Sequence, residues 1–124
     1  NGNTQALFKR ADEFKVDYIM ADEIHSDFNQ VLEQLKLYIS QFEAIYITLD
    51  MDVFDVAFAP SVSAPSINGL TPFQVKYLLK LILKSNKVKL MDVVEVNPNF
   101  DRDAQTAKLA AHMVNEVLKY EPTD

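Results

Sequence analysis

The stretch from Ala44 to Leu70 reads AIYITLDMDVFDVAFAPSVSAPSINGL, and the rest of the chain is organised around it. Its first part, Ile45 to Leu49, is β-branched, aromatic or large apolar, with charged residues on both sides. Such a run predicts a strand that is buried on both faces of a sheet. The part after Asp52 is a long irregular segment with repeated proline and serine. Long loops of this kind in compact domains are usually functional, so we expect this one to wall a pocket.

Two acids, Asp50 and Asp52, close the predicted strand. Because side chains alternate along a strand, both should point to the same side, with Cα atoms roughly 6.6 Å apart. Two carboxylates held about 4 Å apart repel by roughly 4 kcal/mol at an effective dielectric of about 20, unless a proton or a cation lies between them. The pair therefore suggests a site for a divalent metal, and the alternative is a pair of exposed acids that merely ends a strand.

Composition narrows the possible functions. The 124 residues carry 18 acidic and 12 basic side chains, a net charge of -6, and no cluster of Lys and Arg, so we expect no nucleic-acid partner. No apolar run approaches the roughly 20 residues of a membrane span, and the N-terminus lacks a signal-peptide pattern, so a cytoplasmic protein without a membrane partner is expected. The absence of cysteine excludes disulfides, thiolate zinc sites and cysteine nucleophiles. Carboxylate, histidine and hydroxyl chemistry remain, which favours hard or borderline metals.

Outward from this stretch, helical and strand patterns alternate. The expected elements are a helix after Thr4, a strand at Val16 to Met20, a helix with an apolar stripe from Phe28 to Ile39, the strand at Ile45 to Leu49, a helix from Thr71-Pro72 to Leu83, a strand at Val88 to Val96, and a last helix capped by Asp101. This order predicts one α/β domain with a parallel sheet and covering helices. Ligands bind such sheets beyond the carboxyl ends of the strands, where Asp50, Asp52 and Glu95 all fall. His25 and His112 lie outside this group and are expected to be solvated or structural.

Four segments then point to one family. They are Thr48-Leu49-Asp50-Met51-Asp52, Gly69-Leu70-Thr71, Glu95-Val96-Asn97-Pro98 with Asp101, and Thr106-Ala107 with Leu109-Ala110-Ala111. In this order they resemble the S/T-x-D-x-D, G-G-L-T, E-x-N/S-P-x-x-D and T-A-x-L-A-A elements of the ureohydrolases, the family of arginase, agmatinase and formimidoylglutamase. The resemblance implies a three-layer α/β/α fold with a parallel sheet, of which residues 1–124 would be the C-terminal portion of a single domain.

The resemblance also implies roles for three residues and a cofactor. Asp50 would bridge a pair of manganese ions and Asp52 would bind one of them, while a metal-bridging hydroxide attacks a guanidino or formimino carbon. Glu95 would pair with the cationic nitrogen of that small-molecule substrate. A helix-capping or ion-pair role is the alternative for Glu95.

Two departures from the family pattern bear on the substrate and on the chain itself. Asp55 is followed by Val56 where arginases and agmatinases usually have proline, and Ala59 to Pro65 replaces their P-x-x-G-T. This variant is more similar to formimidoylglutamases, which convert N-formimidoyl-L-glutamate to L-glutamate and formamide in histidine degradation; arginase or agmatinase activity is the alternative.

The family's earlier His and D-x-H-x-D ligands have no counterpart here, and the chain begins Asn1-Gly2-Asn3. We therefore expect part of a longer protein, inactive by itself, whose exposed strand edge favours a homo-oligomer.

Two readings from other classes stay open at this point. A buried strand ending in Asp50-Met51-Asp52-Val53 also resembles the haloacid-dehalogenase-like phosphatases, in which the first Asp is a nucleophile assisted by magnesium. That reading leaves Glu95-Val96-Asn97-Pro98 unexplained. A folded half-domain without catalytic activity is the other reading. Metal content and product assays distinguish these possibilities.

Overall fold

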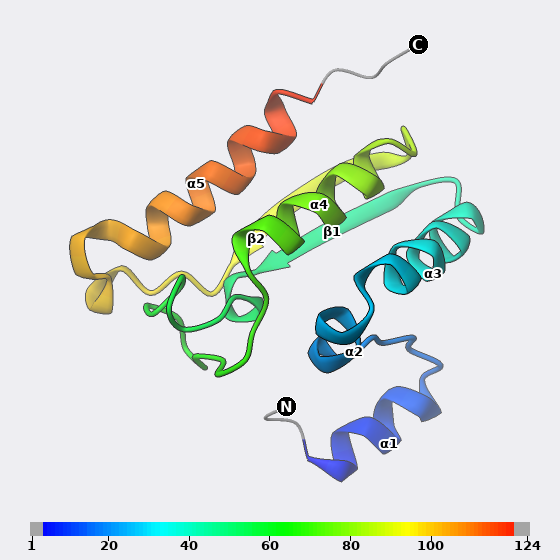
Figure 1. The fold of residues 1–124 in the computed structure, drawn as a ribbon, viewed down its shortest axis with the longest axis horizontal. Helices are drawn as coiled ribbons and strands as arrows, with labels where there is room; N and C mark the ends of the chain where they lie inside the picture. Colours follow the sequence, from blue (N-terminus) through cyan, green and yellow to red (C-terminus); the bar gives the residue numbers. More distant parts are fainter. Residues whose placement is uncertain (1–3, 121–124) are drawn as a thin grey trace.

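The computed structural model describes residues 4–120 and contains helices, short 3-10 turns and one parallel sheet (Figure 1). The helices and strands are α1 (Gln5–Glu13), α2 (Ala21–Ser26), α3 (Phe28–Ser40), β1 (Ile45–Asp50), α4 (Pro72–Leu83), β2 (Val88–Val94) and α5 (Gln105–Leu118). The 3-10 turns are Met51–Val53, Pro98–Phe100 and Arg102–Ala104. None of the helices in this described range is long and apolar enough to cross a membrane.

The sheet places the carboxyl ends of its two strands at the same edge. β1 and β2 pair in parallel, with Ile47 opposite Met91 and Asp50 opposite Val94. The connection between them runs through α4, which lies over the strands with α5 on one side and α3 on the other (Figure 1). Parallel strands require a crossover of this kind, so the predicted parallel sheet with a helix between its strands is confirmed.

One face of the sheet is covered and the other is open in residues 4–120. Ile47 and Leu49 join α3, α4 and α5 in a single apolar core, whereas Tyr46 on the opposite face is 57% exposed and Leu90 is 61% exposed. The expectation that β1 is buried on both faces is therefore wrong for the described chain. β-branched and aromatic residues suit a covered and an open face alike, so their presence in a run does not distinguish the two.

The strand expected at Val16 to Met20 is also absent: these residues form an irregular connection between α1 and α2. Val16 is 54% exposed and Tyr18 is 49% exposed, and the Tyr18 ring packs 5.3 Å from the ring of Phe8. Strand propensity becomes a strand only when a neighbour pairs with the backbone, and no described strand lies alongside this segment.

The three residues predicted to cap helices differ in the capping hydrogen bonds that their side chains make. Thr71 caps α4 with a full capping box: its Oγ1 accepts from the Gln74 N–H at 3.2 Å, and Gln74 Oε1 accepts from the Thr71 N–H at 2.9 Å. Asp101 caps the start of α5 from a distance, because its two carboxylate oxygens accept from the N–H groups of Thr106 and Ala107, each at 2.9 Å. Thr4 occupies the cap position of α1 but makes no side-chain capping bond.

Candidate active site at the carboxyl ends of the strands

The three acids singled out in the sequence meet at one edge of the sheet. Asp50 is the last residue of β1, Asp52 lies in the following 3-10 turn, and Glu95 follows the end of β2 at Val94. Glu95 adopts a left-handed backbone conformation with φ of 70°, which ends the strand two residues before the expected Val96. The parallel register, with Asp50 opposite Val94, then brings the two strand ends together.

The turn after β1 sets the relation between Asp50 and Asp52. Asp50 Oδ1 accepts a hydrogen bond from the Asp52 N–H at 2.8 Å, so the backbone turns at once and the regular alternation of a strand stops at Asp50. The assumption that both acids lie on one straight strand is therefore wrong. The local bond of an Asp side chain to a backbone N–H two residues on competes with strand geometry, and here that turn prevails.

Asp52 is the electrostatically exceptional residue of this edge. The pKa of its carboxyl is raised by burial, then by the negative charges of Asp50 and Glu95, while hydrogen bonds from the Ala64 N–H and the Ser63 hydroxyl oppose this rise. Its Oδ1 is buried and has no hydrogen-bond partner among the described residues. A buried carboxylate oxygen without a partner, beside two further acids, is an unfavourable arrangement that a bound cation would relieve.

These acids suit a hard cation but do not complete a site for one. Carboxylate oxygens are the preferred ligands of ions such as Mn²⁺ and Mg²⁺. Within residues 4–120, however, no group of three or more His, Cys, Asp or Glu side chains is placed to hold a metal ion. The unpartnered Asp52 oxygen and the donor type thus fit a metal, with further ligands needed from outside the described residues.

The sequence reasoning missed Ser63, a hydroxyl at the centre of this edge. Ser63 Oγ donates to Glu95 Oε2 at 2.6 Å and lies 3.5 Å from Asp52 Oδ2. The available signal was its place in the proline- and serine-rich segment. No periodicity or spacing rule distinguishes it from the other serines there.

Asp55 shapes the first part of the loop that follows the acids. Its Oδ1 accepts from the Ala57 N–H and its Oδ2 from the Asn68 N–H, each at 2.9 Å. The pKa of Asp55 is lowered, chiefly by the bond from Ala57 and, against a smaller effect of burial, by those from Asn68 and Gly69. Ser66 Oγ in turn donates to the Asp52 carbonyl at 2.7 Å, which fastens the loop to the acidic turn.

The middle of the loop is fastened to the segment after β2 and to α5 through Ser61. This fully buried serine donates its hydroxyl to the Asn97 carbonyl, and its N–H donates to Thr106 Oγ1 at 3.0 Å. The Asn97 N–H returns a bond to the Ser61 carbonyl at 3.0 Å. The Asn97-Pro98 and Thr106-Ala107 segments therefore hold the wall of the site in place.

The two histidines, His25 and His112, make contacts with residues other than the three acids. His25 Nε2 lies 3.3 Å from the Asn68 carbonyl and its Nδ1 lies 3.3 Å from Gln74 Nε2, so it links α2, the loop and α4. This pattern assigns the tautomer with the proton on Nε2. His112 on α5 lies 3.9 Å from a carboxylate oxygen of Glu116.

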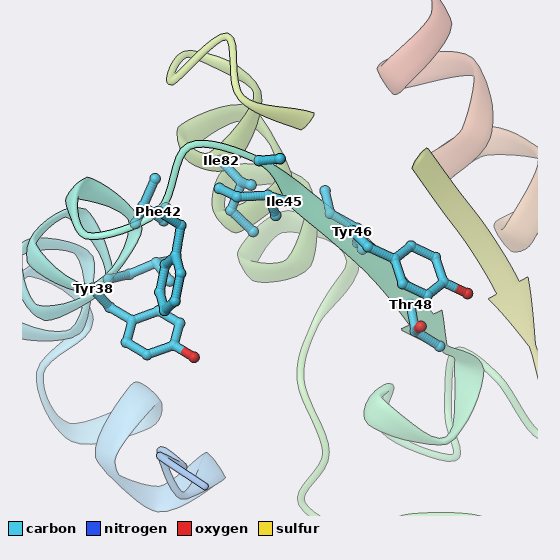
Figure 2. A pocket seen from close by; sticks show the side chains of 10 residues that line it. Tyr38, Phe42, Ile45, Tyr46, Thr48 and Ile82 are labelled. Carbon is cyan, nitrogen blue, oxygen red and sulfur yellow. The ribbon is translucent and has the colours of Figure 1, made fainter. Parts of the chain in front are cut away.

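A hollow of about 400 Å³ lies elsewhere, along the edge of β1 that no described strand pairs with. Figure 2 shows Tyr38 and Phe42 facing Ile45 and Ile82, with Tyr46 farther along the strand. None of the three acids lines it. This apolar edge is a packing surface separate from the candidate active site.

The fold and the site together define an α/β protein whose parallel strands end in a cluster of carboxylates suited to a hard metal ion. A sequence model of the Arginase family matches residues 1–119, and the chain belongs to that family. This confirms the family and the fold class inferred from the four sequence segments.

Individual proteins of known name resemble the chain in sequence and in structure. The chain is 44% identical over 119 residues to formimidoylglutamase of Staphylococcus aureus strain MRSA252, a match that covers 95% of this chain and 38% of the relative. The crystal structure of formimidoylglutamase from Bacillus subtilis strain 168 superposes with a TM-score of 0.87 at 29% identity, over 95% of this chain and 37% of that one. Arginase from Bacillus subtilis shares the fold, with a TM-score of 0.87 at 23% identity over 98% of this chain and 43% of that one. The chain thus spans about two fifths of the length of these relatives.

Proposed function

We propose that the whole protein is a manganese-dependent hydrolase of a linear C–N bond that converts N-formimidoyl-L-glutamate and water to L-glutamate and formamide. The observation that carries the hydrolase proposal is the buried, unpartnered Asp52 oxygen between Asp50 and Glu95. The 44% identity to a formimidoylglutamase supports the choice of substrate. The Ala59 to Pro65 segment, which forms the wall beside the acids, supports the same choice.

The residues of this chain would divide the work between metal and substrate. Asp50 and Asp52 would hold the manganese, with Asp50 bridging the pair. When bound, such a metal pair supplies a water deprotonated near neutral pH and polarises the group that it attacks. Glu95 would bind the cationic nitrogen of the substrate, since a carboxylate forms its strongest hydrogen bonds with charged donors.

The substrate is tested with the whole protein, loaded with manganese, on N-formimidoyl-L-glutamate, arginine and agmatine. We expect a clear preference for N-formimidoyl-L-glutamate. A preference for arginine or agmatine would refute the substrate assignment, and phosphatase activity in place of C–N hydrolysis would refute the reaction.

The metal roles are tested by elemental analysis of two variants. Asp50→Ala should lose more manganese than Asp52→Ala, because a bridging ligand holds two ions and a terminal ligand holds one. Unreduced manganese in both variants would show that neither carboxylate is a ligand.

The role of Glu95 needs a variant that separates substrate binding from metal binding. Glu95→Gln keeps the size of the side chain and removes its charge, so kcat/KM should fall roughly tenfold to a hundredfold while the manganese content stays unchanged. Loss of manganese in this variant would place Glu95 among the metal ligands.

A further inference from the structure

The Thr106 hydroxyl lies at the centre of a buried polar network beside the candidate active site. Thr106 and Ser61 are both 0% exposed, and the Ser61 N–H donates to Thr106 Oγ1 at 3.0 Å. A threonine hydroxyl that accepts in this way keeps its own proton for a second bond. That bond goes to the carboxylate of Asp101, which also accepts from the N–H groups of Thr106 and Ala107, each at 2.9 Å. One side chain therefore joins the loop to the start of α5.

The Asp101 carboxylate is a strong acceptor for this hydroxyl because it is ionised. Burial acts to raise its pKa, but the bonds from the Ala107 and Thr106 N–H groups and from the Thr106 side chain outweigh burial and lower the pKa. A hydrogen bond to a charged acceptor is stronger than one between neutral groups. Asp101 therefore holds the Thr106 hydroxyl in one orientation, with its oxygen free to accept from the loop.

Ser63 lies two residues beyond this anchor, and its hydroxyl donates to Glu95 Oε2 at 2.6 Å. Its place is set on one side by the bonds of Ser61 and on the other by Ala64, whose N–H donates to the Asp52 carboxylate. Within residues 4–120, the Ser63 hydroxyl is the only hydrogen-bond donor to the exposed Glu95 side chain. A long side chain held by one hydroxyl keeps its orientation only while that hydroxyl stays in place.

We propose that Thr106 is a positioning residue for substrate binding, because its hydroxyl anchors the loop that holds the Ser63 hydroxyl against Glu95. This inference rests on the proposed function, in which Glu95 binds the cationic nitrogen of the substrate. A carboxylate oriented before the substrate arrives binds it more tightly, because less side-chain freedom is lost in the complex. The Thr106-Ala107 segment, which lies outside the cluster of acids, thereby acts on substrate binding.

The first test compares kcat and KM of whole manganese-loaded variants for N-formimidoyl-L-glutamate. Thr106→Val keeps the shape of the side chain and removes the hydroxyl, whereas Thr106→Ser keeps the hydroxyl. Met113→Val is the control, because it alters another fully buried residue about two turns further along α5.

We expect Thr106→Val to lower kcat/KM roughly tenfold, mainly through a higher KM, with the manganese content unchanged. Thr106→Ser and Met113→Val should retain the kcat/KM of the unmodified protein. An unchanged kcat/KM in Thr106→Val, or an equal loss in Met113→Val, would overturn the role of Thr106.

A double variant tests whether Thr106 acts through Ser63. Ser63→Ala should by itself raise KM, and Thr106→Val should then cost little further kcat/KM, because the hydroxyl that it positions is already gone. Losses that multiply independently in the double variant would overturn the route through Ser63.

Hydrogen exchange of the whole protein measures the anchor without substrate. The Ser61 amide proton should exchange roughly tenfold faster in Thr106→Val than in the unmodified protein, while exchange in α4 stays unchanged. Equal exchange at Ser61 in the two proteins would overturn the anchor. An unmodified protein that does not hydrolyse N-formimidoyl-L-glutamate would instead refute the proposed function, and the exchange result would still decide the anchor, so the two failures are distinguishable.

Discussion

Gly69 lies where two segments of the loop cross at close range, and Gly69→Ala tests that crossing directly. A Cβ at this position would lie 2.5 Å from the Asp55 backbone nitrogen and 2.5 Å from the Phe54 carbonyl carbon. Carbon atoms in contact normally stay about 3.5 to 4.0 Å apart, so the overlap is about 1 Å. The opposing atoms belong to the backbone and cannot rotate away as a flexible side chain would.

The cost follows from what must move. Relief of the overlap separates the two segments and lengthens the bonds from the Asp55 N–H to the Leu70 carbonyl, 3.0 Å, and from the Leu70 N–H to the Val53 carbonyl, 2.8 Å. Overpacking costs about 1 to 3 kcal/mol and each weakened hydrogen bond costs about 1 kcal/mol. The smaller conformational freedom of alanine in the unfolded chain offsets about 0.4 to 1 kcal/mol. We therefore expect Gly69→Ala to lower the free energy of unfolding by about 2 to 5 kcal/mol.

Urea unfolding followed by circular dichroism measures this loss. With an m-value of about 1.5 kcal/mol per molar urea, the midpoint should fall by about 1 to 3 M. Ile67→Ala is the matched control, because Ile67 lies in the same loop and is 88% exposed, so its midpoint should barely move. A Gly69→Ala midpoint equal to that of the control would refute the close crossing.

Four further predictions concern helix capping, acid stability, self-association and metal binding. Thr71→Ala removes the cap of α4 and should lower the free energy of unfolding by about 1 kcal/mol in the same urea experiment; an unchanged midpoint would contradict the capping box. Hydrogen bonds hold the pKa of Asp55 in the folded protein below its unfolded value of about 3.9. The ionised side chain therefore stabilises the native state above about pH 3.9, and this contribution is lost as the pH falls through the folded pKa. Asp55→Asn should therefore flatten the dependence of stability on pH below about pH 4, and an unaltered acid profile would contradict those bonds. One edge of β1 has no partner strand among the described residues, so the chain should self-associate and sedimentation should give a mass above 14.1 kDa. A charge placed on that edge by Thr48→Lys should shift the mass toward that of the monomer. A strictly monomeric unmodified chain would contradict this prediction. Calorimetry of the chelator-stripped chain should show no tight binding of a manganese pair, and two ions bound with micromolar or better affinity would contradict the need for outside ligands.

The local sequence determined the elements whose signals lie within a few residues of one another. The run from Ile45 to Leu49 is a strand, and Thr71 with Gln74 begins a helix through bonds between neighbours in the chain. The acids at the strand ends were likewise predictable, because parallel strands joined by a crossover must end at the same edge. These features depend on alternation and local hydrogen bonding, which the order of residues specifies.

Tertiary structure decided what depends on a neighbour distant in the chain. Val16 to Met20 has the residues of a strand but no described partner for its backbone, and Tyr46 faces an open side of the sheet because the described helices cover only the other. The contact of Ser63 with Glu95 joins residues 32 positions apart, which no periodic pattern encodes. A hydrogen bond between such residues depends on Ser61 and Ser66, which fasten the loop to Asn97 after β2 and to the acidic turn, and this fastening places a serine hydroxyl between two carboxylates.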